Sequence, residues 1–260
     1  MTVRRVDVRR CIGFAALFVA LACSSAAVAQ PRWPDQRQAG PLLCHADFPL
    51  DAQQPLLAEL ADLQRDLVKV LGAAETRETV HVFLFQAKPT YQAYMQQYFP
   101  KVPYRRALFI KARGPGMVFA FRGDDFEIDV RHESTHALLH TWLKSAPLWL
   151  DEGLAEYFEV PHDQRAGRHP HLAAVRALVR SGELPRLEAL EQLDEIGQMG
   201  RDEYRDAWAW VHFAIHGPPA ANEELTRYLA DLASGGEPGP FSDRLRRLPD
   251  LNRRVVEHFR

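Results

Sequence analysis

The residues that most constrain the fold of this chain are His132-Glu133-Ser134-Thr135-His136. Residues four positions apart lie one above the other on an α-helix, so His132 and His136 would point the same way and could bind one metal ion. Glu133 follows the first histidine directly, where it can reach a water on the ion more easily than the ion itself. The segment therefore predicts a helix that has to lie beside another part of the chain that completes the site.

The flanking residues favour that helix. Apolar side chains recur close to the helical period at Phe126, Val130, Ala137, Leu138 and Trp142. Two acidic residues at 124 and 125 give the negative charge that suits a helix N-terminus, and Pro147 closes the segment.

A second helix is predicted from Leu148 to Glu159, before Pro161 stops it. It carries Glu152 and Glu156 on one face, and a carboxylate on a packing surface is costly unless a positive group receives it. A metal ion held by two imidazoles is such a group, so the predicted metal ligands are His132, His136 and Glu152, with a fourth position open to water. The alternative is a helical hairpin with two solvated glutamates and a histidine pair that faces the core.

This pattern, His132-Glu133-x-x-His136 followed by Trp149-Leu150-Asp151-Glu152-Gly153, resembles the gluzincin metallopeptidases. It is most similar to the bacterial peptidase MA-like proteins, which are distant relatives of the catalytic domain of the M1 aminopeptidases. The strong part of the resemblance covers residues 126–160, with a weaker similarity around Tyr204 to Phe213. The resemblance implies that Glu152 is the third ligand of one zinc ion.

The resemblance also implies a zincin-like α+β fold, in which a small mixed β-sheet packs on the active-site helix and its last strand lies along the substrate cleft. The M1 aminopeptidases carry a Gly-x-Met-Glu-Asn strand, whose glutamate holds the free amine of the substrate. The nearest counterpart here, residues 116–121, contains no acidic residue, which favours endopeptidase over aminopeptidase action.

The predicted function is an exported zinc-dependent metallopeptidase that hydrolyses peptide bonds of a peptide or protein substrate. Zinc lowers the pKa of its bound water to about 7, and Glu133 would take the proton as general base. Tyr204 and His212 lie on one face of a later helix. Some gluzincins use a tyrosine from a later helix, so the resemblance implies Tyr204 as the first candidate to stabilise the oxyanion and His212 as the second; the alternative is that this face packs in the core. Glu156 is a candidate to hold the free ring nitrogen of His132 or His136.

Other assignments stay open. His140 is one turn beyond His136. It is eight residues from His132, a helix rise of about 12 Å, so the three histidines cannot share one ion. The same zinc chemistry could act on non-protein amide bonds, or a structural zinc site could serve a peptide-binding protein without catalysis. The sequence leaves the substrate preference and the oligomeric state open.

Residues 1–29 have the pattern of a signal peptide: four arginines, an apolar core from Ile12 to Ala22, and small residues before Gln30. We expect a periplasmic or secreted protein, with lipid anchoring at Cys23 less favoured and no transmembrane segment after signal removal. Cleavage would take four arginines and one aspartate from the 32 basic and 34 acidic residues, which leaves a formal net charge of about −5. An acidic protein is a poor candidate for binding nucleic acid, and Cys44 would remain without a disulfide partner.

Residues 30–50 are rich in proline and glutamine and predict a loose N-terminal arm, followed by a single zincin-like domain over residues 51–260. Within that domain, hydrophobic periodicity predicts a helix over 52–71, a strand over 79–85, a helix over 91–99, and strands over 107–110 and 117–121. After the two metal-site helices, the C-terminal half is predicted to be mainly helical, with helices over 172–181, 186–195, 201–216, 223–233 and 241–259.

Overall fold

A computed structural model describes residues 33–111 and 114–260 as a mixed α+β protein. Within these residues the strands are short and lie in the first half of the chain. They are β1 (Asp35–Ala39), β2 (Leu42–Ala46), β3 (Val80–Phe85), β4 (Ala107–Ile110) and β5 (Met117–Phe121). The three strands predicted from the alternation of apolar residues are confirmed, the first of them starting one residue late.

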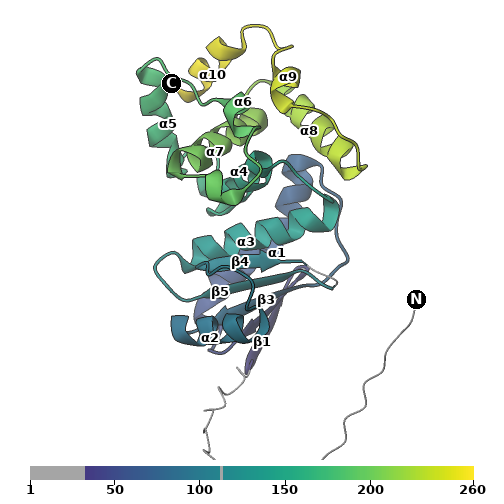
Figure 1. The fold of residues 1–260 in the computed structure, drawn as a ribbon, viewed down its shortest axis with the longest axis vertical. Coiled ribbons are helices and arrows are strands. Elements are labelled where there is room, and N and C mark those ends of the chain that lie inside the picture. The colour runs from purple at the N-terminus through teal and green to yellow at the C-terminus, as the bar shows by residue number, and fades with distance from the viewer. Residues whose placement is uncertain (1–32, 112–113) are drawn as a thin grey trace, which may run out of the picture.

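The strands form one mixed sheet in the order β1-β2-β3-β5-β4. The two central pairings, β2 with β3 and β3 with β5, are parallel, whereas both outer pairings are antiparallel. Figure 1 shows α1 and α3 on one face of this sheet and α2 on the other. Both edge strands of the sheet, β1 and β4, are therefore antiparallel to their neighbours.

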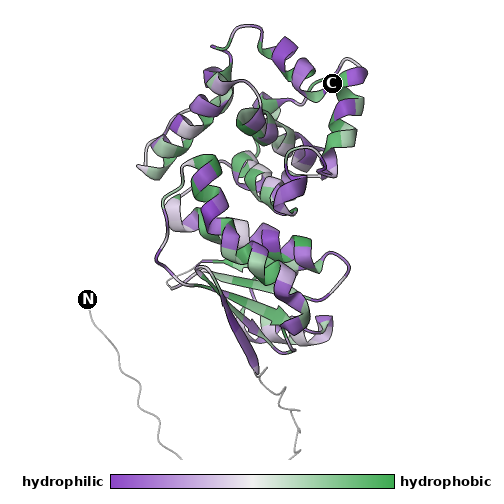
Figure 2. Cartoon of the chain, turned by 180° about the vertical axis from the view of Figure 1, so that it is seen from behind, coloured by the Kyte–Doolittle hydropathy of each residue, from purple (hydrophilic) through white to green (hydrophobic). Residues whose placement is uncertain are grey.

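The loose arm predicted for residues 30–50 is wrong over most of its length, because residues 35–46 form the β1–β2 hairpin. In β2 the side chains of Leu42, Cys44 and Ala46 are buried in alternation, which is the pattern of a strand with one face on a core. The residues of β1 are mostly polar, so they show no such pattern, and β1 is an edge strand with one partner only in the sheet. Figure 2 shows the contrast between the hydrophilic edge and the apolar inner strands.

The two faces of the sheet have different cores. Side chains such as Val82, Leu84 and Val118 belong to the main core, which also includes residues of α1 and α3. The opposite face carries a smaller aromatic cluster that includes Phe85 and Phe119 and is covered by α2. This second face explains why β3 and β5 are apolar at nearly every position.

The first four helices are close to their predicted positions. They are α1 (Gln54–Leu71), preceded by a short 3-10 turn (Asp51–Gln53), α2 (Lys88–Tyr98), α3 (Phe126–Trp142) and α4 (Leu148–Phe158). Helix α1 ends at Gly72, which adopts a left-handed conformation with φ 70°. Helix α3 ends where Leu143 becomes extended, before Pro147 opens α4.

The C-terminal half is helical, as predicted. It contains α5 (His171–Arg180), α6 (Leu187–Leu190), α7 (Arg201–His216), α8 (Pro219–Ala233), α9 (Phe241–Leu245) and α10 (Leu251–Phe259), with short 3-10 turns at His162–Gln164 and Ile196–Gln198. Two predicted helices were too long. The segment predicted as 186–195 is helical over one turn only, and the segment predicted as 241–259 is divided around Pro249, which lacks the backbone N–H a helix needs.

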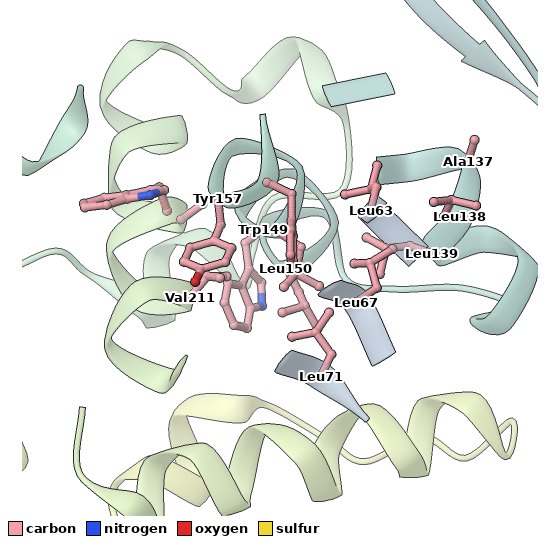
Figure 3. Close-up of a cluster of buried hydrophobic side chains, with 14 of the residues drawn as sticks. Leu63, Leu67, Leu71, Ala137, Leu138, Leu139, Trp149, Leu150, Tyr157 and Val211 are labelled. Atoms are coloured by element: carbon pink, nitrogen blue, oxygen red, sulfur yellow. The ribbon is translucent and has the colours of Figure 1, made fainter. Parts of the chain in front are cut away.

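The sheet and the helical half share one continuous core. Apolar side chains from four helices meet there, namely Leu63, Leu67 and Leu71 of α1, Leu138 and Leu139 of α3, Trp149 and Leu150 of α4, and Val211 of α7 (Figure 3). Helices α4 and α7 approach so closely that a Cβ atom on Gly153 would lie 2.7 Å from the Ala207 carbonyl oxygen. Gly153 thus lets α4 lie directly on α7, which fixes the position of the preceding residue, Glu152.

The predicted signal peptide at residues 1–29, with Cys23 and the proposed cleavage site, lies outside the described residues. Among the described residues, Cys44 is buried and unpaired. No helix within 33–111 and 114–260 has both the length and the apolar character needed to cross a membrane.

A buried histidine network lies between α7 and α10. The Nε2 atom of His212 lies 2.9 Å from the carbonyl oxygen of Ala166, and because a carbonyl can only accept, this nitrogen carries the proton. The Nδ1 atom of His212 therefore accepts a hydrogen bond from Nε2 of His258, 2.9 Å away. Burial lowers the pKa of His212 to about 3 and that of His258 to about 4.

This network predicts that acid destabilises the fold. A histidine whose pKa is about 6.5 unfolded and about 3 folded binds a proton only in the unfolded chain between these values. The free energy of unfolding should therefore fall as the pH decreases below 6.5, and His212 alone contributes about 2 kcal/mol of that loss at pH 5. Urea unfolding of metal-free protein at pH 7 and pH 5 measures the loss.

The His212→Gln variant should show a smaller difference between the two pH values than the unmodified protein. His162→Gln provides the control, because His162 is exposed in a short turn. An equal pH dependence in the His212→Gln variant and the unmodified protein would contradict the prediction.

Candidate metal centre

Helix α3 presents the two histidines to the helical half of the molecule. Its other faces are buried, because Val130, Ala137 and Leu138 belong to the main core. The predicted helical spacing is confirmed, and the Nε2 atoms of His132 and His136 lie 3.2 Å apart. The side chain of His132 is 16% exposed and that of His136 is 9% exposed, so both imidazoles are largely removed from solvent.

Glu152 reaches the same point from α4. Its Oε2 atom lies 3.4 Å from Nε2 of His132 and 3.6 Å from Nε2 of His136. The structure thus brings together the three predicted ligand residues, and their donor atoms form a nearly equilateral triangle.

The size of this triangle fits a metal ion. Ligand atoms bound to one tetrahedral zinc at about 2.0–2.1 Å are separated by roughly 3.3 Å. The three separations here are 3.2, 3.4 and 3.6 Å. Two imidazole nitrogens and one carboxylate oxygen are also a donor set that zinc accepts, so these residues could hold one ion without rearrangement.

The outer nitrogen of each imidazole faces a second carboxylate. Nδ1 of His132 lies 2.9 Å from Oε2 of Glu159, and Nδ1 of His136 lies 3.2 Å from Oδ2 of Asp151. The first contact is a hydrogen bond that fixes the ring orientation and the tautomer of His132, leaving its Nε2 directed at the shared point. The second has ion-pair distance but not hydrogen-bond geometry, so it acts on His136 through charge.

These carboxylates favour positive charge on the imidazole pair. Burial opposes protonation of His132, but Glu152 and Glu159 outweigh it and raise its pKa well above the ordinary value. Burial likewise opposes protonation of His136, and the carboxylates of Asp151 and Glu152 raise its pKa to about 10. The same contacts keep Glu152 ionised, since the imidazoles lower its pKa although burial acts in the opposite direction.

Glu156, the residue predicted to hold one of the ligand histidines, has a different hydrogen-bond partner. Its Oε2 atom lies 2.8 Å from Nε2 of His171 on α5. Glu159, almost two turns further along the chain than Glu152, contacts His132 instead. A spacing of four residues predicted that Glu156 would share the helix face of Glu152. In the structure it is Glu159, at the C-terminal end of α4, that lies next to His132.

Two other groups of side chains in the described residues are close enough to hold an ion. They are His136, His140 and Asp151, and His132, Glu156 and Glu159. Each group shares one histidine with the predicted site, His136 in the first and His132 in the second. In both groups a carboxylate already has an imidazole as hydrogen-bond partner, Asp151 with His140 and Glu159 with His132. His140 belongs to the first of these groups, since its Nε2 atom lies 3.1 Å from Oδ2 of Asp151.

Glu133, the predicted general base, lines the same cleft as the candidate ligands. Its carboxylate faces the cleft beside His132 and His136, and burial raises its pKa. The backbone of Phe109 in β4 acts in the opposite direction, because its N–H hydrogen-bonds to the carboxylate. The strand beside the site is therefore β4, an edge strand, whereas the resemblance implied the last strand, β5, which lies inside the sheet.

Two cavities of about 810 and 490 Å³ meet at the site. Both are lined by the same four residues, Arg105, His132, Glu133 and Tyr204, and the smaller one also by His136 and Glu152. The cavities extend from the site in different directions, one along Asp129 and Glu156 and the other along β4. They form a single cleft, here called the metal cleft, which passes across the three ligand residues.

The two candidate oxyanion donors lie in different places. Tyr204 lines both parts of the metal cleft, and burial together with the charge of Glu152 raises its pKa to about 12, which keeps its hydroxyl protonated. His212 lines neither part and is hydrogen-bonded within the helical core. Tyr204 therefore remains a candidate oxyanion donor, whereas the hydrogen bonds of His212 hold helices and loops of the core together.

Comparison with known proteins adds no assignment to this geometry. No protein-family model matches the sequence, and a search of curated proteins found no significant match.

The geometry predicts one zinc ion per chain, bound by His132, His136 and Glu152. Replacing Glu152 with alanine leaves two ligands, and zinc affinity should fall by more than the roughly 10- to 100-fold that follows loss of a supporting contact. Competition against a chelator of known affinity, with metal analysis after dialysis, measures both stoichiometry and affinity. His140→Ala is the matched control and should retain one ion, and loss of the ion in that variant would instead favour the His136, His140 and Asp151 group.

The outer carboxylates generate a second prediction. Glu159→Gln and Asp151→Asn should each weaken zinc binding about 10- to 100-fold, because an amide supports the ligand imidazole less well than a carboxylate. Glu156→Gln should have a smaller effect, since its partner is His171. The same chelator competition compares the three variants, and a larger loss for Glu156→Gln than for Glu159→Gln would support the choice made from helical spacing.

Proposed function

We propose that this protein is a zinc-dependent metallopeptidase of the gluzincin type, with a zincin-like fold and with endopeptidase rather than aminopeptidase action. The observation that carries the proposal is the convergence of His132, His136 and Glu152 in a cleft that also contains Glu133. A site that served only structure would have no use for a carboxylate held beside the ligands and open to the cleft.

The ion would supply Lewis acidity, which makes a water molecule acidic enough to attack an amide carbonyl near neutral pH. The carboxylate of Glu133 would take the proton from the attacking water and later deliver it to the leaving amine. Its partial burial and its contact with the Phe109 backbone hold it near the ligands in a fixed orientation. The protonated hydroxyl of Tyr204 would donate a hydrogen bond to the oxygen that becomes negative in the transition state.

Two features support a peptide as substrate. Among the described residues no strand pairs with the outer side of β4, and an extended peptide can pair with such an edge. The metal cleft continues on both sides of the ligand residues, which leaves room for substrate residues before and after the cleaved bond. A cleft of this shape favours cleavage within a chain.

Replacing Glu133 with glutamine should reduce turnover about 10²- to 10⁴-fold, because the amide cannot accept the proton, while zinc content stays at one ion per chain. Cleavage of a mixed peptide library, with products mapped by mass spectrometry, measures the activity. The wild-type protein should lose activity with a chelator and recover it when zinc is restored. Normal turnover by the Glu133→Gln variant would remove the assigned role, and a zinc-loaded wild type that cleaves no peptide would remove the peptidase function itself.

A further inference from the structure

The carboxylates of the larger part of the metal cleft already have partners. Asp125 and Asp129 both form ion pairs with Arg106, which lies 2.8 Å from Asp129. Glu156 is hydrogen-bonded to His171, and Glu159 contacts His132. Five acidic side chains line this part of the cleft, and four of them are occupied by basic groups of the protein.

Two arginines of the same cavity have no acidic partner. Among the described residues, neither Arg105 nor Arg201 forms an ion pair or a side-chain hydrogen bond, and both are exposed. Arg201 lies one turn before Tyr204 on α7, so the two side chains share a helix face. Arg105 precedes β4, and its charge acts directly on Tyr204, whose pKa it lowers against the stronger effect of burial.

We infer that Arg105 and Arg201 bind a carboxylate group of the substrate, so that the metal cleft prefers peptides with negative charge near the cleaved bond. This inference rests on the proposed peptidase function and adds a substrate class to it. Arg105 borders both parts of the cleft and Arg201 the larger part, so both lie beside the proposed catalytic groups Glu133 and Tyr204.

The residue type suits this role. A guanidinium group donates up to five hydrogen bonds in a planar arrangement that matches a carboxylate, and it stays charged at every relevant pH. An unpaired arginine at the surface is ordinary, but two of them flank a cleft in which the other strong cations already have acidic partners. Arg106 pairs with two aspartates, and Lys111 pairs with Glu78. The positive charge that remains for a ligand is therefore concentrated at Arg105 and Arg201. A carboxylate could come from an acidic side chain or from the C-terminus of a peptide.

The test uses zinc-loaded full-length protein and peptides derived from a sequence that the library shows to be cleaved. One series replaces each residue around the cleaved bond with glutamate or glutamine, and another compares a free C-terminus with an amide. We expect a charged peptide to have a kcat/KM roughly tenfold above its neutral counterpart, with a preference that weakens at high salt. The series in which the preference occurs identifies the source of the carboxylate.

The preference should disappear in an Arg105→Gln, Arg201→Gln double variant, mainly through a higher KM for the charged peptide. Arg180→Gln is the matched control, because Arg180 is exposed on α5 and lines neither part of the metal cleft. Calorimetric titration of the same peptides into the Glu133→Gln protein measures binding without turnover and should show the same preference.

Cleavage with equal kcat/KM for charged and neutral peptides would overturn this inference and leave the peptidase function intact. A preference that survives in the double variant would also overturn it, since the charge would then be bound elsewhere. If the zinc-loaded protein cleaves no peptide, the proposed function fails first and this inference fails with it.

Discussion

The carboxylate of Glu152 lies buried between two helices, and the arrangement around it depends on how that charge is satisfied. Only 7% of the residue is exposed, and an ionised carboxylate removed from water is costly unless a positive group receives it. The receiving groups are the imidazoles of α3, so α4 has to cross α3 at this level of the helix. Gly153 makes the position possible from the other side, because it allows α7 to contact the backbone of α4. The candidate metal site thus also lies where the sheet half and the helical half of the molecule pack together.

The charges around the imidazole pair are matched to a divalent cation. Asp151, Glu152 and Glu159 surround His132 and His136, and together they raise the pKa of both rings. The surroundings therefore favour positive charge at this point. One divalent ion bound by two neutral imidazoles would supply that charge. The carboxylates that orient the rings for a metal are consequently the same groups that stabilise the fold around the site.

The parts of the structure that follow from local pattern could be predicted from the sequence, and the parts that follow from packing could not. The spacing of His132 and His136 predicted α3. The segment between Pro147 and Pro161 predicted α4. The outer carboxylates were missed because a spacing of four residues selected Glu156, whereas the crossing of α3 and α4 brings Glu159 to His132. Strand β1 was missed because an edge strand with polar residues carries no alternation, and the identity of the edge beside the site depends on the order of strands rather than on their sequence.

The metal cleft is assembled from both halves of the molecule, which explains why its binding groups are far apart in the chain. The sheet half contributes Arg105 and the edge of β4, and α7 in the helical half contributes Arg201 and Tyr204. Helix α7 also carries Ala207, which contacts Gly153, so the same helix positions Glu152 and presents the groups that would meet a substrate. A shift of α7 would therefore move a metal ligand and the cleft wall together. Such coupling favours a rigid cleft, in which one packing contact fixes both the geometry of the candidate ligands and the position of the cleft wall.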